Sequence, residues 1–182
     1  AASLGLSRGE FSQMRQAYDY SLPAGEYFER CRLKTSGLFT AACRLGAILS
    51  GAGETAVAAV GEYGDCLGLA FQIADDILDY SGDSSRSGKL TGTDLRDGTV
   101  TLPLIIAMER DPSLAKLLEE SEVTGELVEE VRERVTATGA LEESSLTAYG
   151  YVERARSALR AADEIDTEPL KLIAAAAVDR KA

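Results

Sequence analysis

The chain has 182 residues, of which 45% are hydrophobic, and it carries a formal net charge of −11. A domain of this length can bury a sizeable core, and the acidic charge argues against binding to nucleic acid or anionic lipid, where basic residues are expected. The sequence contains no histidine, which excludes Ser-His and Cys-His catalysis and removes the commonest zinc ligand.

Helical periodicity dominates the sequence, and alternating runs of β-branched residues are scarce. In chain order, the pattern predicts helices over about residues 7–18, 26–49, 54–80, 104–108, 113–120, 125–138, 141–163 and 168–180. Glycine and proline residues separate these helices, and the longest irregular stretch covers residues 81–98. Because no internal repeat or low-complexity linker is present, we expect a single all-α domain over residues 1–182.

The third predicted helix carries an acidic stripe. Asp75, Asp76 and Asp79 have the spacing D-D-x-x-D and share with Gln72 a sector about 100° wide. The rest of the helix is apolar, which predicts that it is buried and that its acids face protein or an internal cleft. Carboxylates crowded in such a place repel one another and favour a hard cation such as Mg²⁺. The alternative is a solvated charged face, as in residues 119–133, where acids alternate with arginines.

Small residues lie beside the acidic stripe. Gly64 and Gly68 precede the acids on or near the same side of the helix. We expect them to leave room for a ligand next to the carboxylates.

Lys34 lies at the centre of an apolar stripe on the helix predicted over residues 26–49. The stripe consists of Tyr27, Cys31, Leu38, Ala41, Ala42, Leu45, Ile48 and Leu49. A buried ammonium group should meet an anion, which can belong to a ligand or to a structural ion pair. A lysine that extends its end to solvent is a third possibility.

The loop after the acidic helix offers glycines and a positive charge. Gly88 and Gly92 permit a close approach of the backbone, and Lys89 lies between them. The loop lacks the G-x-x-x-x-G-K pattern of a P-loop and by itself indicates only a solvated loop. Its position beside the carboxylates predicts a polyphosphate site in which metal ions bridge the two sets of anions.

The three cysteines indicate a reducing compartment. Cys31, Cys43 and Cys66 are odd in number and lack C-x-x-C spacing, so we expect free or buried thiols. No apolar run reaches the length of a membrane span, and the sequence does not begin with the pattern of a secretory signal. We therefore expect a cytoplasmic location without membrane insertion.

These motifs together resemble the trans-isoprenyl diphosphate synthase family, also called the polyprenyl synthetase family. Residues 68–80 resemble its second aspartate-rich motif, G-x-x-F-Q-x-x-D-D-x-x-D, and residues 88–105 its G-K-x-x-G-x-D-L … T-L-P segment. Lys34 and Thr35 match the family's Lys-Thr pair, and residues 9–13 its preceding G-E-x-x-Q turn. The resemblance implies a helical bundle of the isoprenoid synthase type.

The resemblance also implies a reaction. An allylic diphosphate would ionise with the help of Mg²⁺, and isopentenyl diphosphate would attack the carbocation, which requires neither histidine nor a protein nucleophile. By the resemblance, the catalytic residues are Lys34, Thr35, Gln72 and Lys89. The same four residues and Phe71 would bind the substrate. The metal ligands would be Asp75, Asp76 and Asp79.

The sequence departs from the family pattern in two ways that bear on whether the chain is active alone. The family's first aspartate-rich motif and its basic residues for isopentenyl diphosphate, both N-terminal, have no counterpart here, and Thr99 stands where many members have a lysine. We therefore expect the C-terminal half of a synthase, an incomplete bundle that is inactive alone. Its activity would belong to a longer parent, expected to be a homodimer, or to a complementing chain.

Two other functions remain possible from the sequence. One is a non-catalytic subunit of a heteromeric prenyl synthase, although such a subunit has little physical reason to keep buried acids. The other is a class I terpene cyclase, which ionises a diphosphate in the same way without a second substrate. Residues 88–103 resemble the synthases more closely.

Overall fold

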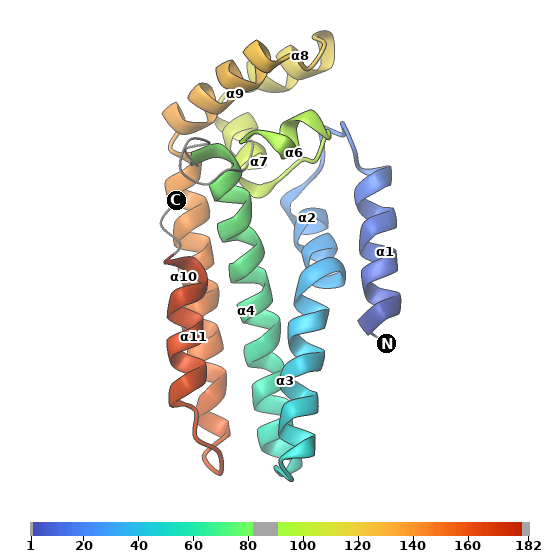
Figure 1. The fold of residues 1–182 in the computed structure, drawn as a ribbon. Helices are drawn as coiled ribbons and strands as arrows, with labels where there is room; N and C mark the ends of the chain where they lie inside the picture. Colours follow the sequence, from blue (N-terminus) through green and yellow to red (C-terminus); the bar gives the residue numbers. More distant parts are fainter. Residues whose placement is uncertain (1, 82–90, 180–182) are drawn as a thin grey trace.

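The structure is a computed structural model that describes residues 2–81 and 91–179, and within these ranges it consists of helices without strands (Figure 1). The elements are α1 (Ala2–Arg15), α2 (Ala24–Cys31), the π-helical segment η1 (Arg32–Ser36), α3 (Gly37–Leu49), α4 (Glu54–Ser81), α6 (Thr93–Arg96), α7 (Leu102–Arg110), α8 (Ser113–Glu120), α9 (Gly125–Ala137), α10 (Ala140–Ala158), the 3₁₀ turn η2 (Leu159–Ala161) and α11 (Glu168–Val178). The predicted all-α class is confirmed.

The long helix α4 forms the centre of the molecule. It packs between α3 and α10, with α11 beside α10, while α8 and α9 cross one end of these rods (Figure 1). The side chains of Leu69 and Ile73 are fully buried in a large core cluster, and Val60 and Cys66 of the same helix belong to a second cluster. Since α4 contributes to both clusters, its acidic end is held rigidly against its neighbours.

The helix predicted over residues 26–49 is not continuous. A π-helical segment, η1, separates α2 from α3, and the N–H of Gly37 donates to the carbonyl of Arg32, five residues earlier. Such wide turns are rare and occur often at functional sites. Here the segment contains Lys34 and Thr35.

Glycines allow η1 to lie against both α1 and α4. A Cβ atom on Gly68 would lie 2.5 Å from Cα of Ser36, and one on Gly9 would lie 2.7 Å from the backbone N of Lys34. A Cβ atom on Gly64 would lie 2.8 Å from the carbonyl oxygen of Phe39. The expectation that Gly64 and Gly68 leave room for a ligand is therefore wrong, because the backbone of η1 and α3 fills that space.

The apolar stripe predicted around Lys34 is covered only in its first half. Tyr27 and Cys31 are buried, whereas the large side chains of the stripe on α3 are 42–85% exposed. The exposed residues are Leu38, Leu45, Ile48 and Leu49. Periodicity correctly identified an apolar face, but in the part of the chain that the structure describes no other side chain covers its second half.

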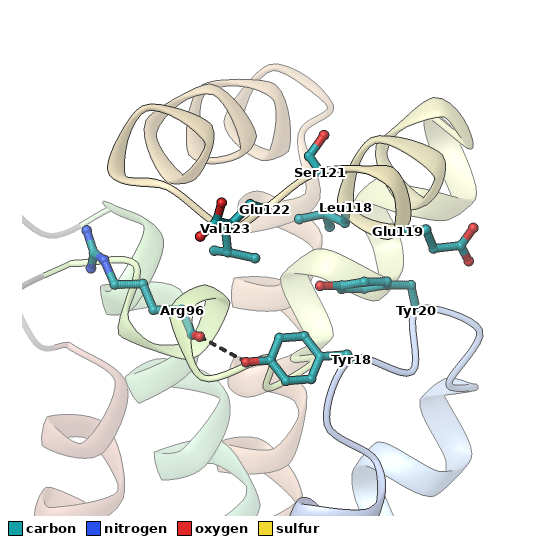
Figure 2. A pocket seen from close by; sticks show the side chains of 8 residues that line it. All are labelled: Tyr18, Tyr20, Arg96, Leu118, Glu119, Ser121, Glu122 and Val123. Carbon is teal, nitrogen blue, oxygen red and sulfur yellow. Dashed lines mark hydrogen bonds between the residues drawn. The ribbon is translucent and has the colours of Figure 1, made fainter.

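The connection between α1 and α2 is fastened to the connection between α6 and α7. Tyr18 has a φ of 62°, which is uncommon for a residue other than glycine. Its N–H donates to the carbonyl of Gly98 at 2.8 Å and its hydroxyl to the carbonyl of Arg96 at 3.3 Å (Figure 2). Gly98 itself has a φ of 68°, and a Cβ atom there would lie 2.6 Å from the Tyr18 ring. This contact fixes the backbone just before Thr99.

Among residues 2–81 and 91–179, no helix has the length and apolar character needed to cross a membrane.

Candidate functional site

A cavity of about 220 Å³ lies where the C-terminal part of α4 meets α2, η1 and the start of α7. Its walls carry carboxylates, cations and neutral polar groups from segments that are far apart in the sequence. The lining residues are Gln13, Tyr27, Arg30, Cys31, Lys34, Gln72, Asp75, Asp76, Asp94, Thr99 and Thr101. The cavity thus brings together four of the residues predicted from the sequence, Lys34, Gln72, Asp75 and Asp76.

Asp76 forms the buried floor of this cavity, and its side chain is 4% exposed. The hydroxyl of Tyr27 donates to its Oδ2 at 2.6 Å, and Nε2 of Gln72 donates to its Oδ1 at 2.9 Å. The hydroxyl of Thr35 in turn donates to Oε1 of Gln72 at 2.6 Å. These bonds connect η1 to the acidic helix and hold the carboxylate of Asp76 in one orientation.

Burial raises the pKa of Asp76 to about 6, although the hydrogen bonds from Tyr27 and Gln72 lower it. Burial is the largest cause because the carboxylate has lost its hydration. Sequence reasoning missed Tyr27, which was assigned to the core. The only signal was its spacing of two helical turns before Lys34.

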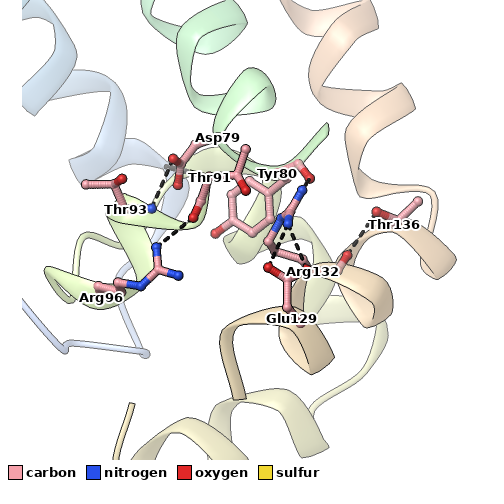
Figure 3. Close-up of polar contacts among 8 residues, drawn as sticks. All are labelled: Asp79, Tyr80, Thr91, Thr93, Arg96, Glu129, Arg132 and Thr136. Atoms are coloured by element: carbon pink, nitrogen blue, oxygen red, sulfur yellow. Dashed lines mark hydrogen bonds and ion pairs between the residues drawn. The ribbon is translucent and has the colours of Figure 1, made fainter. Parts of the chain in front are cut away.

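The other two acids of the motif have different surroundings. Asp75 is exposed at the rim of the cavity. Asp79 points toward α6, where its Oδ1 accepts the N–H of Thr93 and its Oδ2 the N–H of Asp94, both at 3.0 Å (Figure 3). The carboxylate of Asp79 therefore anchors the first turn of α6. It does not line the cavity.

Arg132 of α9 fixes the end of the acidic helix. Its Nε and Nη2 donate to the carbonyl of Tyr80 at 3.0 and 2.7 Å, while its Nη1 contacts the carboxylate of Glu129 (Figure 3). A guanidinium group at a helix C-terminus also interacts favourably with the helix dipole. Asp79 and Tyr80 are thus held from two sides.

Lys34 of η1 lines the cavity and is half-buried. Its Nζ donates to Oε1 of Gln13 at 2.8 Å and lies 3.3 Å from Oε1 of Glu10. Nε2 of Gln13 donates to the hydroxyl of Thr99 at 3.3 Å. The ion pair predicted as one alternative for Lys34 is present, and the residue also lines the cavity.

Asp94 adds a third carboxyl group to the cavity wall, and sequence reasoning did not assign it to the site. Its pKa is raised to about 8, chiefly by burial and in addition by the charges of Asp76, Asp79 and Asp75, whereas the charge of Lys34 lowers it. The signal that could have identified Asp94 was its place after Gly92 in the same loop motif. Three carboxyl groups and two cations, Lys34 and Arg30, therefore line the cavity.

The donor atoms of the cavity suit a hard cation. Its acids and hydroxyls offer oxygen atoms, which is the ligand type that Mg²⁺ prefers. Within residues 2–81 and 91–179, no three acids or cysteines lie close enough together to hold a metal by themselves. Magnesium ions commonly bind to one or two carboxylates and take their other ligands from water and phosphate, so Asp75 and Asp76 fit such an ion.

Two further predicted residues, Thr35 and Phe71, do not line the cavity. Thr35 reaches the site only through Gln72. Phe71 is half-buried and packs on Phe39, with ring centroids 5.4 Å apart. Lys89 lies outside the residues that the structure describes.

Replacing Asp94 by asparagine is expected to stabilise the protein at alkaline pH in the absence of divalent ions. Because the pKa of Asp94 is about 8 in the folded state against 3.8 ordinarily, the folded state binds more protons than the unfolded state between these values. The free energy of unfolding of the wild type should therefore fall as the pH rises from about 4 to about 8. Asparagine does not titrate, so the variant should not show this fall.

Calorimetry in EDTA tests this prediction. The Asp94→Asn protein should melt several degrees higher than the wild type at about pH 8.5 and no higher at about pH 4. Added Mg²⁺ should narrow the difference at alkaline pH, because a cation stabilises the charged form. A difference in Tm that does not grow with pH would contradict the prediction.

Comparisons with known proteins identify similar chains. The polyprenyl synthetase family model matches residues 1–137. Decaprenyl-diphosphate synthase subunit 1 of Schizosaccharomyces pombe is 34% identical over 160 residues, which are 85% of this chain and 42% of that protein. Heptaprenyl diphosphate synthase component 2 of Geobacillus stearothermophilus is 35% identical over 153 residues, 82% of this chain and 47% of that one.

Solved structures show the same helical bundle. A polyprenyl synthase from Caulobacter crescentus CB15, complexed with calcium and isoprenyl diphosphate, has a TM-score of 0.91 and 36% identity, covering 100% of this chain and 57% of that one. A heptaprenyl diphosphate synthase from Staphylococcus aureus has a TM-score of 0.91 at 23% identity, which shows likeness of fold. The predicted fold type is confirmed, and the chain spans less than half the length of the two curated relatives named above.

Proposed function

Since the chain belongs to the polyprenyl synthetase family, we propose that it carries the allylic-diphosphate site of a trans-prenyltransferase. The whole enzyme would condense an allylic diphosphate with isopentenyl diphosphate. The observation that carries this proposal is the cavity that Asp75 and Asp76 of α4 line together with Lys34 of η1. Carboxylates and a fixed ammonium group around one cavity are what a metal-bound diphosphate requires.

Mg²⁺ is the proposed cofactor, held by Asp75 and Asp76, with Asp79 as the third acid of the motif. Each oxygen of Asp79 accepts one backbone hydrogen bond, and a carboxylate has about four acceptor sites, so it retains capacity for a ligand. When bound, the metal would neutralise charge on the departing diphosphate. The Caulobacter relative was solved with calcium and isoprenyl diphosphate, which supports a hard cation and a diphosphate ligand.

The residues of the chain have defined roles in the proposed reaction. The bond between C1 of the allylic substrate and its diphosphate oxygen breaks, and the oxygen keeps the electron pair. Lys34 stabilises the negative charge on the leaving group, a task proposed also for Lys89. The side-chain oxygens of Thr35 and Gln72 stabilise the positive charge on the allyl group, whose chain would pass Phe71.

Bond formation completes the reaction. C4 of isopentenyl diphosphate attacks C1 of the allyl cation, and a proton leaves C2 of the former isopentenyl unit for the released diphosphate. The product is five carbons longer and retains one diphosphate. No protein group needs to form a covalent bond, which agrees with a chain that lacks histidine.

The site for isopentenyl diphosphate is proposed to lie outside this chain. The residues described here would form the C-terminal half of the catalytic bundle, and the exposed apolar face of α3 is consistent with further helices packing there. We propose that the whole enzyme is a cytoplasmic homodimer. Relatives named as subunits or components favour a heteromer as the second candidate, and the mass of the purified complex distinguishes the two.

The decisive experiment uses the full-length synthase with Mg²⁺, farnesyl diphosphate and labelled isopentenyl diphosphate. We expect products lengthened by five-carbon units together with released diphosphate, and no product from the 182-residue chain alone. A cyclic hydrocarbon formed from farnesyl diphosphate alone would instead indicate a terpene cyclase. The absence of any reaction from the full-length protein would overturn the proposal.

A further inference from the structure

Arg30 is a buried cation of the cavity to which the proposed function assigns no role. It lies on α2, its side chain is 4% exposed, and it belongs to the cavity wall. Its Nη1 donates to Oε1 of Gln16 at 3.0 Å, and its Nη2 donates to the carbonyl of Val100. Both partners are neutral.

Arg30 therefore forms no salt bridge among residues 2–81 and 91–179, although its charge lowers the pKa of Asp76 in the same cavity. None of the ion pairs formed in these ranges includes Arg30, and its guanidinium carbon lies 5.7 Å from the centre of the Tyr27 ring. Taking a charged group out of water is costly unless an opposite charge meets it. Only two of the five N–H groups of the guanidinium are needed for the bonds to Gln16 and Val100. The others are available to an anion in the cavity.

The wall beside Arg30 lacks a lysine where the family resemblance leads one to expect it. Thr99 occupies that position, is buried, and accepts a hydrogen bond from Gln13. Arg30 donates to the carbonyl of the very next residue, Val100. The guanidinium group thus reaches, from a different helix, the same wall to which a lysine side chain at position 99 would belong.

We propose that Arg30 binds the diphosphate in this cavity and supplies the cation that Thr99 does not. This inference rests on the proposed function. Planar guanidinium groups bind two phosphate oxygens at once more readily than an ammonium group does. Lys34 and Arg30 would then approach the diphosphate from η1 and α2, while the acids of α4 approach it from the other side.

The competing role is structural. Arg30 also connects α2 to Gln16, just after α1, and to Val100, just before α7. A structural role predicts lower stability with unchanged affinity for diphosphate. A binding role predicts lower affinity that another cation on the same wall can restore.

The test measures binding of inorganic pyrophosphate with Mg²⁺ to the full-length synthase by calorimetry, together with the KM for the allylic diphosphate. Arg30→Met should lower the affinity for pyrophosphate and raise the KM for the allylic diphosphate, each by about 10- to 100-fold. Arg32→Met is the matched control, because Arg32 is exposed, does not line the cavity and pairs with Asp65 at 3.8 Å. We expect this control to change neither value by more than about twofold.

A second substitution decides whether charge is the cause. Adding Thr99→Lys to Arg30→Met should restore most of the affinity, whereas adding Thr99→Met should not. If Arg30→Met does not fold, Arg30→Gln is used in its place, alone and in both double variants, because glutamine keeps an N–H donor for the carbonyl of Val100. Wild-type affinity in the single variant, or equal affinity in the two double variants, would overturn the inference.

These outcomes are separate from failure of the proposed function. A wild-type synthase that neither binds pyrophosphate nor elongates an allylic diphosphate would refute the proposed function and this inference together. A wild-type synthase that does both, with Arg30 variants that match it, would refute only the role of Arg30.

Discussion

Asp75→Ala in the full-length synthase is expected to lower kcat by about 100- to 1,000-fold, the usual effect of removing one electrostatic contact to a transition state. Asp75 lines the cavity and is exposed, so its removal leaves no buried hole. Its charge also raises the pKa of Asp76 and Asp94. The variant should therefore fold normally and, without divalent ions, melt at the same temperature as the wild type or higher.

The measurement is the initial rate at saturating substrates as Mg²⁺ is varied, with Tm determined in EDTA on the same samples. Glu62→Ala serves as the control, because Glu62 is an exposed carboxylate on the same helix that does not line this cavity. It should leave both the rate and its dependence on Mg²⁺ unchanged. An Asp75→Ala protein with the wild-type rate and metal dependence would contradict the proposed role of Asp75 in holding a metal.

Gly68→Ala is expected to destabilise the protein by about 1–3 kcal/mol, which is typical of an overpacked contact. The added Cβ would lie 2.5 Å from Cα of Ser36, and backbone atoms cannot rotate away as a side chain can. The expected loss exceeds the gain of about 1 kcal/mol that alanine gives over glycine inside a helix. Because η1 must move, Lys34 and Thr35 move with it, and kcat should also fall.

Gly46→Ala is the matched control for this change. Gly46 lies within α3 and has no atom within 4 Å of the position of an added Cβ. The same substitution should therefore stabilise the protein by up to about 1 kcal/mol. Urea unfolding of both variants measures the difference, and a Gly68→Ala protein as stable as Gly46→Ala would show that η1 does not press on α4.

The sequence predicted what depends on periodicity and on residue type. The apolar surroundings of Asp75 and Asp76 correctly indicated a buried helix whose acids face an internal cavity, and Lys34 was correctly placed near an anion. Periodicity could not reveal where the other side chains of the motif point. Asp79 turns to the backbone of α6 because two N–H groups there need acceptors.

Other features had no sequence signal strong enough to recognise. A single π-helical turn at Lys34 preserves the general helical pattern, so the break between α2 and α3 was missed. Tyr27 and Arg30 lie on the same helix as core residues, and their part in the cavity depends on what α4 and α7 bring against them. Gly64 and Gly68 were recognised as small, but only the position of the neighbouring backbone shows what their size allows.

The attachment of Tyr18 to Gly98 has a consequence for protein engineering. The cavity wall that contains Thr99 and Val100 is supported by contacts between the α1–α2 connection and the α6–α7 connection, which lie about eighty positions apart in the chain. Grafting the α6–α7 connection from a relative into this protein would leave that wall unsupported unless residue 18 were transplanted as well. The two connections should therefore be exchanged as a pair in any chimera.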